Sequence, residues 1–231
     1  MSISPSLPQS TTSDLMVESI ADQLYRVLRD RITSGFYPPG VRLDPQAVAR
    51  EFGVSRTPVR DAIAQLDHDQ LIETRPRSGT FVARPGIEDV HEVCQLRKGI
   101  EWVATGVAAA TMPMSKIADL RAEAEEALVS LRNGDFEPFF HSDMRLHREI
   151  VAETGNARMM RARGSVEPFI AWLRILGATG PHRAEGSTAR HLQILDAMAA
   201  RDVAAAQQAA AIHLDEVEEW TTADMRSSAS D

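Results

Sequence analysis

Four residues in the second half of the chain have side chains that could bind a divalent metal ion: Asp143, His147, His191 and His213. Asp143 and His147 are four residues apart, so on a helix both side chains project from one face. Three imidazoles and one carboxylate would together suit Zn²⁺, with Ni²⁺ or Mn²⁺ as alternatives. The spacing alone leaves structural roles open: a hydrogen-bonded Asp–His pair, a helix-end cap at His191 and a core residue at His213.

The segment that must position these side chains is helical in pattern and rich in alanine. Periodicity and capping residues predict helices near residues 87–111, 115–132, 136–154, 156–177, 186–200 and 202–226. Ser115, Asn156 and Asp202 are the expected first residues of three of these helices, and His191 is expected to open another. This half of the chain is therefore expected to be an all-α bundle of about six helices.

The first half of the chain carries a helix-turn-helix pattern. A helix over residues 17–34 and a short strand over 41–43 precede a helix over 44–52 that ends in a glycine turn. Ser55 can cap the next helix, whose apolar face consists of Val59, Ile63 and Leu66. The polar and basic start of this helix, Arg56, Thr57 and Arg60, therefore has the pattern of a segment that enters a DNA major groove.

A β-hairpin is expected directly after the helix-turn-helix. Residues 71–74 and 80–83 have strand character, and residues 75–79 between them form a basic tip that ends in Gly79. Such a hairpin is the wing of a winged helix. The predicted fold is therefore mostly α, with an N-terminal winged helix-turn-helix, a small β-hairpin wing and a C-terminal helical bundle.

Composition shifts divide the chain into four parts. We expect a disordered tail over residues 1–15, a DNA-binding domain over 16–85, a helical domain over 86–226 and a second tail over 227–231. Of the net charge of −8, residues 16–85 contribute 10 arginines and 9 acids, and residues 86–231 contribute 15 basic and 23 acidic residues. A DNA-contacting face in the first domain is electrostatically possible, whereas the acidic second domain should stay off DNA.

Other features of the composition fit a protein of the reducing cytoplasm. Cys94 is the single cysteine, so no internal disulfide can form, and no apolar run approaches the length of a membrane helix. The first residues have neither the charge nor the apolar core of a signal peptide. Trp102, Trp172 and Trp220 fall in different predicted helices and are expected to pack in the core.

The first domain resembles the GntR family of bacterial transcription regulators. The resemblance rests on residues 54–60, Leu66, Leu71-Ile72 and residues 78–82. It implies a homodimer that binds an inverted-repeat operator in double-stranded DNA. Arg56 and Arg60 are then the expected base readers, because arginine bound to guanine by two hydrogen bonds is the commonest specific contact.

The same resemblance assigns the remaining contacts to the DNA backbone. Ser55, Thr57 and the wing residues Arg77 and Gly79 are expected to fix the register through phosphates and the minor groove. The sequence departs from the family at Gln70, where a glycine usually ends the recognition helix. Gln70 should therefore take a left-handed conformation, or the helix should end differently.

The helical domain resembles the FCD subgroup of that family, the FadR-like branch. Three patches carry the resemblance: residues 95–101, residues 143–147 with 154–156, and residues 191–197 with His213. It implies that Asp143, His147, His191 and His213 are metal ligands and that the domain binds a small organic acid. Arg97 matches the arginine of the subgroup's first helix and is the expected effector contact, the alternative being an ion pair with Glu101.

These expectations combine into a ligand-responsive repressor whose small carboxylate effector changes the affinity of a homodimer for DNA. One alternative is a metal-dependent hydrolase-like enzyme, in which the ion activates water. No further carboxylate or histidine lies at a spacing suited to a general base, and such an enzyme would have no use for the first domain. The other alternative is a DNA-binding protein whose helical domain only dimerises.

Overall fold

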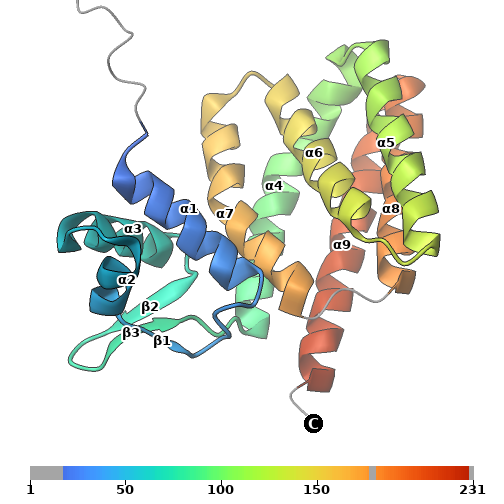
Figure 1. The fold of residues 1–231 in the computed structure, drawn as a ribbon. Helices are drawn as coiled ribbons and strands as arrows, with labels where there is room; N and C mark the ends of the chain where they lie inside the picture. Colours follow the sequence, from blue (N-terminus) through green and yellow to red (C-terminus); the bar gives the residue numbers. More distant parts are fainter. Residues whose placement is uncertain (1–17, 177–180, 229–231) are drawn as a thin grey trace, which may run out of the picture.

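The computed structural model describes residues 18–176 and 181–228, and the expected tail over 1–15 lies outside them. Its elements follow in the order α1 (Ile20–Thr33), β1 (Arg42–Leu43), α2 (Pro45–Phe52), α3 (Arg56–His68), β2 (Ile72–Arg75), β3 (Gly79–Val82), α4 (Ile87–Thr111), α5 (Met114–Arg132), α6 (Glu137–Glu153), α7 (Ala157–Leu176), α8 (Pro181–Ala199) and α9 (Val203–Ser228). A head made of α1–α3 and the strands lies beside a bundle made of α4–α9 (Figure 1). The expected mostly α architecture is therefore confirmed.

The head is a helix-turn-helix packed on α1. Gly53 ends α2 in the left-handed region, with φ of 64°, where a residue without a Cβ has no steric penalty. Ser55 occupies the N-cap position of α3, but its side chain makes no capping hydrogen bond. Val59 and Leu66 of α3 are fully buried and pack in one cluster with Leu28 of α1. This packing fixes the start of α3 relative to the rest of the head.

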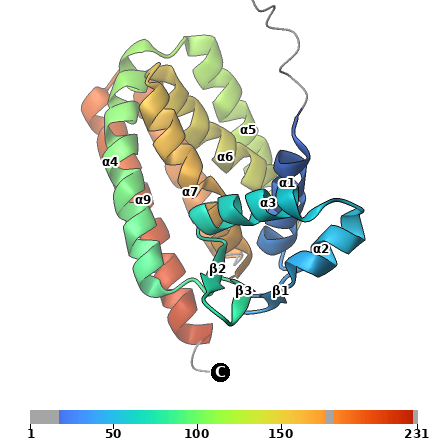
Figure 2. The ribbon, with the colours of Figure 1, turned by 90° about the vertical axis from the view of Figure 1, so that its left-hand side faces the viewer.

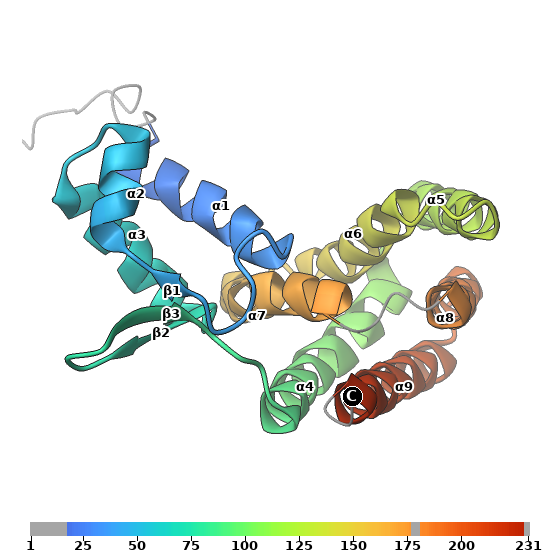
Figure 3. The same ribbon diagram turned by 60° about the horizontal axis from the view of Figure 1, so that its bottom comes forward.

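The wing is a three-stranded antiparallel sheet with strand order β1-β3-β2, rather than a hairpin alone. The predicted strand near residue 42 pairs with the hairpin, with Arg42 opposite Phe81. The hairpin projects away from the helical bundle (Figure 3). Before it, Gln70 has φ of 58°, so of the two alternatives that the sequence left open the residue takes the left-handed conformation.

The bundle has α4 and α9 side by side on one face, while α5 packs against α6 and α8 (Figure 2). The bounds of α4 agree with the prediction, and Asn156 and Asp202 cap α7 and α9 through their side chains. One helix start was wrong, because α8 begins at Pro181 rather than near residue 186, whereas α5 begins at Met114, one residue before the expected Ser115. His191 therefore lies in the middle of α8 and is not a helix-end cap.

The end of the chain also differs from the prediction. The tail was expected to begin at residue 227, but α9 continues through Ser228. None of the helices in the described ranges combines the length and the apolar character required to cross a membrane.

A shared hydrophobic cluster joins the head to the bundle through α7. Phe169, Ile170 and Trp172 of α7 are buried in the same cluster as Leu28 and Ile32 of α1. The two helices lie next to each other in Figures 1 and 3. The position of α7 therefore affects how the head is held against the bundle.

Candidate functional site

The start of α3 presents the predicted DNA-contacting side chains to solvent. Ser55, Arg56, Thr57 and Arg60 are all exposed, and neither arginine makes an ion pair within residues 18–176 and 181–228. Arg56 and Arg60 are four residues apart on the helix, so their side chains project from one face. Both guanidinium groups are therefore available to an external acceptor.

The tip of the wing adds a second basic position. Arg77 is exposed and adopts φ of 64°, and Gly79 follows it with φ of 116°. Arg77 lies in the turn between β2 and β3, and Gly79 is the first residue of β3, where it pairs with Arg75. These residues are positioned for contacts outside the head and make no contribution to its core.

Asp143, His147, His191 and His213 meet in the middle of the bundle. They come from α6, α8 and α9, and their potential ligand atoms all lie within 4.8 Å of one another. The Nε2 atom of His213 is 3.2 Å from Nε2 of His147 and 3.3 Å from Nε2 of His191. The Oδ1 atom of Asp143 is 3.5 Å from Nε2 of His191 and 3.9 Å from Nε2 of His147.

This cluster fits one divalent ion. Two nitrogens bound to the same tetrahedral zinc at about 2.0–2.1 Å lie about 3.3 Å apart, which matches the spacing of the Nε2 atoms. Each of the three histidines is 1% exposed and Asp143 is 5% exposed, so bulk water does not solvate them. The donor set of three imidazoles and one carboxylate is one that Zn²⁺ accepts, and Ni²⁺ also favours imidazole.

The local electrostatics keep His147 in the form that binds metal. Burial lowers the pKa of His147 below its ordinary value of 6.5, although the charge of Glu101 acts in the opposite direction. Burial alone would raise the pKa of Glu101, but Arg97, His147 and Arg163 hold it well below its usual range. His147 therefore stays neutral at pH 7 beside an ionised carboxylate.

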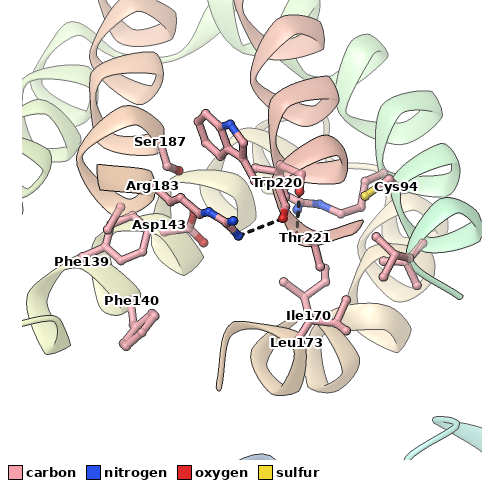
Figure 4. Close-up of a pocket in the computed structure, with 15 residues that line it drawn as sticks. Cys94, Phe139, Phe140, Asp143, Ile170, Leu173, Arg183, Ser187, Trp220 and Thr221 are labelled. Atoms are coloured by element: carbon pink, nitrogen blue, oxygen red, sulfur yellow. Dashed lines mark hydrogen bonds between the residues drawn. The ribbon is translucent and has the colours of Figure 1, made fainter. Parts of the chain in front are cut away.

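A cavity of about 70 Å³ adjoins the cluster at Asp143. Figure 4 shows the residues that line this cavity. Asp143 belongs both to the cluster and to the lining of the cavity. The rest of the lining is largely apolar or aromatic, with a few polar groups: Val90, Val93, Cys94, Arg97, Phe139, Phe140, Ile170, Leu173, Arg183, Ala184, Ser187, Val217, Trp220 and Thr221. A mostly apolar cavity with a few polar groups is typical of small-molecule sites.

Arg97 makes the ion pair with Glu101 that the sequence offered as the alternative, and it also lines the cavity. Its Nε donates to Glu101 Oε1 at 2.9 Å, and both side chains are almost fully buried. The Nη2 atom of Arg97 is also buried and has no hydrogen-bond partner among the described residues. Because Arg97 lines the cavity as well, it retains donor capacity for a ligand.

The sequence did not single out Arg183 as a site residue. Its Nη1 donates to the backbone oxygen of Trp220 at 2.8 Å, and its guanidinium pairs with Asp224 (Figure 4 shows the contact with Trp220). Arg183 lies in the part of α8 that was predicted to be a loop, so helical spacing gave no reason to choose it. The signal that could have found it is a basic residue eight positions before His191 on the same helix.

The three tryptophans have three different environments. Trp172 is fully buried between head and bundle, and Trp220 lines the cavity. Trp102 was expected in the core, but it is 45% exposed on α4. Its exposure, together with that of nearby apolar residues, makes this part of α4 unusual for the surface of a monomer.

Comparison with protein families assigns both halves of the chain. Residues 20–82 match the model of bacterial regulatory proteins of the gntR family, and residues 92–216 match the model of the FCD domain. The FCD match covers more than half of the chain. The first match contains the head and the second contains all four residues of the histidine cluster.

Individual relatives agree with this assignment. The transcriptional regulator YdhC of Bacillus subtilis (strain 168) is 28% identical over 192 residues, which cover 83% of this chain and 86% of YdhC. The transcriptional repressor RspR of Escherichia coli (strain K12) is 25% identical over 202 residues, or 87% and 89% of the two chains.

A solved structure also matches most of the fold. The crystal structure of a GntR transcriptional regulator from Rhodococcus sp. RHA1 aligns with a TM-score of 0.72 at 25% identity, covering 87% of this chain and 96% of that one. The families and relatives are transcriptional regulators rather than enzymes, which removes the basis for the hydrolase alternative. The chain belongs to the GntR family of bacterial transcriptional regulators, with a GntR-type DNA-binding head and an FCD helical domain.

Proposed function

We propose that this protein is a repressor that binds an inverted-repeat operator as a homodimer and responds to a small carboxylate. The observation that carries the proposal is the shared position of Asp143, which belongs to the histidine cluster and borders the adjoining cavity. A ligand in this cavity can contact a metal ion at the cluster. The assignment as a repressor is supported by the name of the relative RspR.

Operator recognition is assigned to the exposed start of α3 and to the wing. The guanidinium groups of Arg56 and Arg60 form no ion pair with any other described residue and lie on one helix face, which suits bidentate hydrogen bonding to guanine. Ser55 and Thr57 beside them can donate to phosphates, and Arg77 with Gly79 can follow the backbone into the minor groove. The division of the chain at residue 86, where Gly86 precedes α4, separates this DNA-binding domain from the helical domain.

Asp143, His147, His191 and His213 would hold one divalent metal ion, with Zn²⁺ as the first choice and Ni²⁺ or Mn²⁺ as alternatives. Its chemistry there would be that of a Lewis acid toward the oxygen atoms of the effector. Three protein nitrogens and one carboxylate leave room for an oxygen ligand if the ion expands its coordination beyond four.

The effector is assigned to the cavity beside the cluster. Its small volume suits a small organic acid, and its apolar and aromatic lining suits the carbon skeleton of such a molecule. Arg97 is the proposed carboxylate contact, because its buried Nη2 atom has donor capacity to spare.

Dimerisation is assigned to the bundle, and α4 offers an apolar surface for it. Leu96 and Val103 are seven residues apart on α4, which places them on one face, and they are 41% and 51% exposed. Trp102, adjacent to Val103 in the chain, is also exposed. A second copy of the chain on this face would bury these side chains and would supply the symmetry that an inverted repeat requires.

The test starts from DNA selection with the full chain. Fragments enriched from a random-sequence pool should contain an inverted repeat, and gel shifts should measure affinity for it with and without a chelator. Thermal unfolding in lactate, succinate or citrate should then show stabilisation by at least one acid. The Arg97→Met variant should lose that stabilisation, whereas Arg145→Met, outside the cavity, should keep it.

The outcomes separate the parts of the proposal. A selection that enriches no inverted repeat would contradict symmetric operator binding. An acid that stabilises wild type and Arg97→Met equally would remove Arg97 from the effector site. A domain that binds neither metal nor acid would support the alternative that the bundle only dimerises.

A further inference from the structure

Glu101 is a buried carboxylate at the centre of the bundle to which the proposed function assigns no role. It lies on α4 and is 2% exposed. Its Oε2 atom is 2.6 Å from Nδ1 of His147, and its Oε1 atom accepts a hydrogen bond from Nε of Arg97 at 2.9 Å. The Nε atom of Arg163, on α7, is 3.9 Å from Oε1. One carboxylate therefore contacts three elements of the bundle.

The charges around Glu101 hold it in the ionised form. Two guanidinium groups face its Oε1 atom, and Arg163 is paired in addition with Glu167, one turn further along α7. Removing a carboxylate from water is unfavourable unless such partners compensate for the loss of solvation. An ionised carboxylate can only accept hydrogen bonds, so the atom of His147 that faces it must be the protonated one.

This contact decides which nitrogen of His147 is available to a metal ion. With the proton on Nδ1 toward Glu101, the lone pair of Nε2 is left on the other side of the ring. The Nε2 atom is the one that lies 3.2 Å from Nε2 of His213, within the cluster. The rings of these two histidines are also stacked, with centroids 5.1 Å apart and planes inclined by 20°.

We propose that Glu101 is a positioning residue of the cluster, which fixes the ring and the tautomer of His147 so that Nε2 faces the ion. Metal-bound histidines commonly donate a hydrogen bond from their second ring nitrogen to a carboxylate in this way. The proposal rests on the metal site of the proposed function. It also connects the effector cavity to the metal site through a chain of contacts, because Arg97 lines the cavity and donates a hydrogen bond to Glu101.

The position of Arg97 would allow a bound effector to change the interactions of Glu101. An effector carboxylate that draws the guanidinium of Arg97 toward the cavity would weaken its hydrogen bond with Glu101. The carboxylate of Glu101 would then interact more strongly with His147 and Arg163. Effector binding and metal affinity are therefore expected to be coupled, and the coupling should pass through Glu101.

The experiment compares wild type, Glu101→Gln and Thr105→Val by Zn²⁺ competition titration against a chromophoric chelator. Thr105 lies one turn after Glu101 on α4, is 1% exposed, and its hydroxyl has no hydrogen-bond partner among the described residues. The Thr105→Val variant therefore serves as the control for a buried substitution on the same face of α4 that leaves Glu101 in place. Glu101→Gln should weaken Zn²⁺ binding by about 10- to 100-fold, and Thr105→Val should leave it unchanged.

A second readout reports on the tautomer itself. In the metal-free wild type, ¹⁵N chemical shifts of the histidine rings should show His147 as the Nδ1-protonated form. In Glu101→Gln the two tautomers should mix. A carboxylate that served only to stabilise the fold would leave the tautomer of His147 unchanged in any variant that folds.

The outcomes distinguish this inference from the metal site on which it rests. Equal Zn²⁺ affinity in wild type and Glu101→Gln would overturn the positioning role and leave the metal site intact. A wild-type chain without Zn²⁺ affinity would overturn the site and this role together. If Glu101→Gln does not fold, the double variant Glu101→Gln, Arg163→Met removes one compensating charge and should show the same loss of affinity.

Discussion

The Oδ1 atom of Asp143 lies 3.5 Å from Nε2 of His191, and the same aspartate borders the cavity beside the histidine cluster. A single side chain thus connects a candidate metal centre with a candidate effector site. Both lie in a bundle that shares a hydrophobic cluster with the head through α7. Ile170 of α7 belongs to this hydrophobic cluster and also lines the cavity, so side-chain packing connects the cavity with the head.

Arg56→Ala and Arg60→Ala should each abolish specific operator binding while the dimer stays folded. Losing a bidentate contact to guanine should cost about 1–3 kcal/mol of binding free energy. Gel shifts at one fixed salt concentration would measure this loss. Arg26→Ala is a suitable control, because Arg26 is an exposed arginine of α1 that pairs with Glu18. Operator affinity equal to wild type in both variants would contradict the proposed docking of α3.

A charge on the apolar face of α4 should break the dimer. Leu96→Asp or Val103→Asp would place a carboxylate where the proposed interface excludes water, and a buried charge without a partner is strongly unfavourable. Sedimentation at micromolar concentration should then give a monomer. Val129→Asp introduces the same charge at a position on α5 that is 57% exposed and should remain a dimer. A dimer in all three variants would move the interface elsewhere.

The metal-free protein should become less stable as the pH falls from about 7.5 to about 5.5. Burial lowers the pKa of His147, so below its ordinary value of 6.5 the unfolded chain binds a proton that the folded chain does not. The free energy of unfolding must then decrease with falling pH, by at most about 1.4 kcal/mol per pH unit for one proton. Urea unfolding with chelator present would measure the slope.

The variant His147→Gln isolates the contribution of this one group. It lacks the titrating imidazole, so its free energy of unfolding should depend less steeply on pH than that of wild type. His141→Gln is the matched control, because His141 lies on the same helix but is exposed. Equal slopes in wild type and His147→Gln would show that His147 titrates alike in both states.

The sequence predicted the elements whose signals are local. The glycine turn at Gly53 and the bounds of α4 follow from short-range sterics and from periodicity, and the left-handed Gln70 is one of the two alternatives that the sequence offered. The start of α8 did not, because the helix was expected to begin near residue 186, whereas in the structure it begins at Pro181 and runs through Gly186. A glycine inside a helix costs only about 1 kcal/mol, which tertiary packing readily compensates.

Residues of the candidate site could be named from the sequence where their types suggest metal binding. Residues whose role depends only on tertiary contacts could not be named in this way. The three histidines and the aspartate of the cluster were named from their metal-binding side chains and from the resemblance, and the fold brings them together. Glu101 was visible in the sequence only as an i,i+4 partner of Arg97, because its approach to His147 joins α4 to α6. The exposure of Trp102 was missed for a related reason, since helical spacing does not show which face of a helix packs against its neighbours.

The most direct test of this account is the metal content of the purified chain, measured by elemental analysis after growth and purification with added Zn²⁺. Wild type and the control His141→Ala should hold about one divalent ion per chain, since one set of four ligands makes one site. His147→Ala and His213→Ala should each hold far less, because each loses one of the four bonds to the ion. Equal metal content in all four proteins, or none in any of them, would contradict the metal site and leave only a helical cavity.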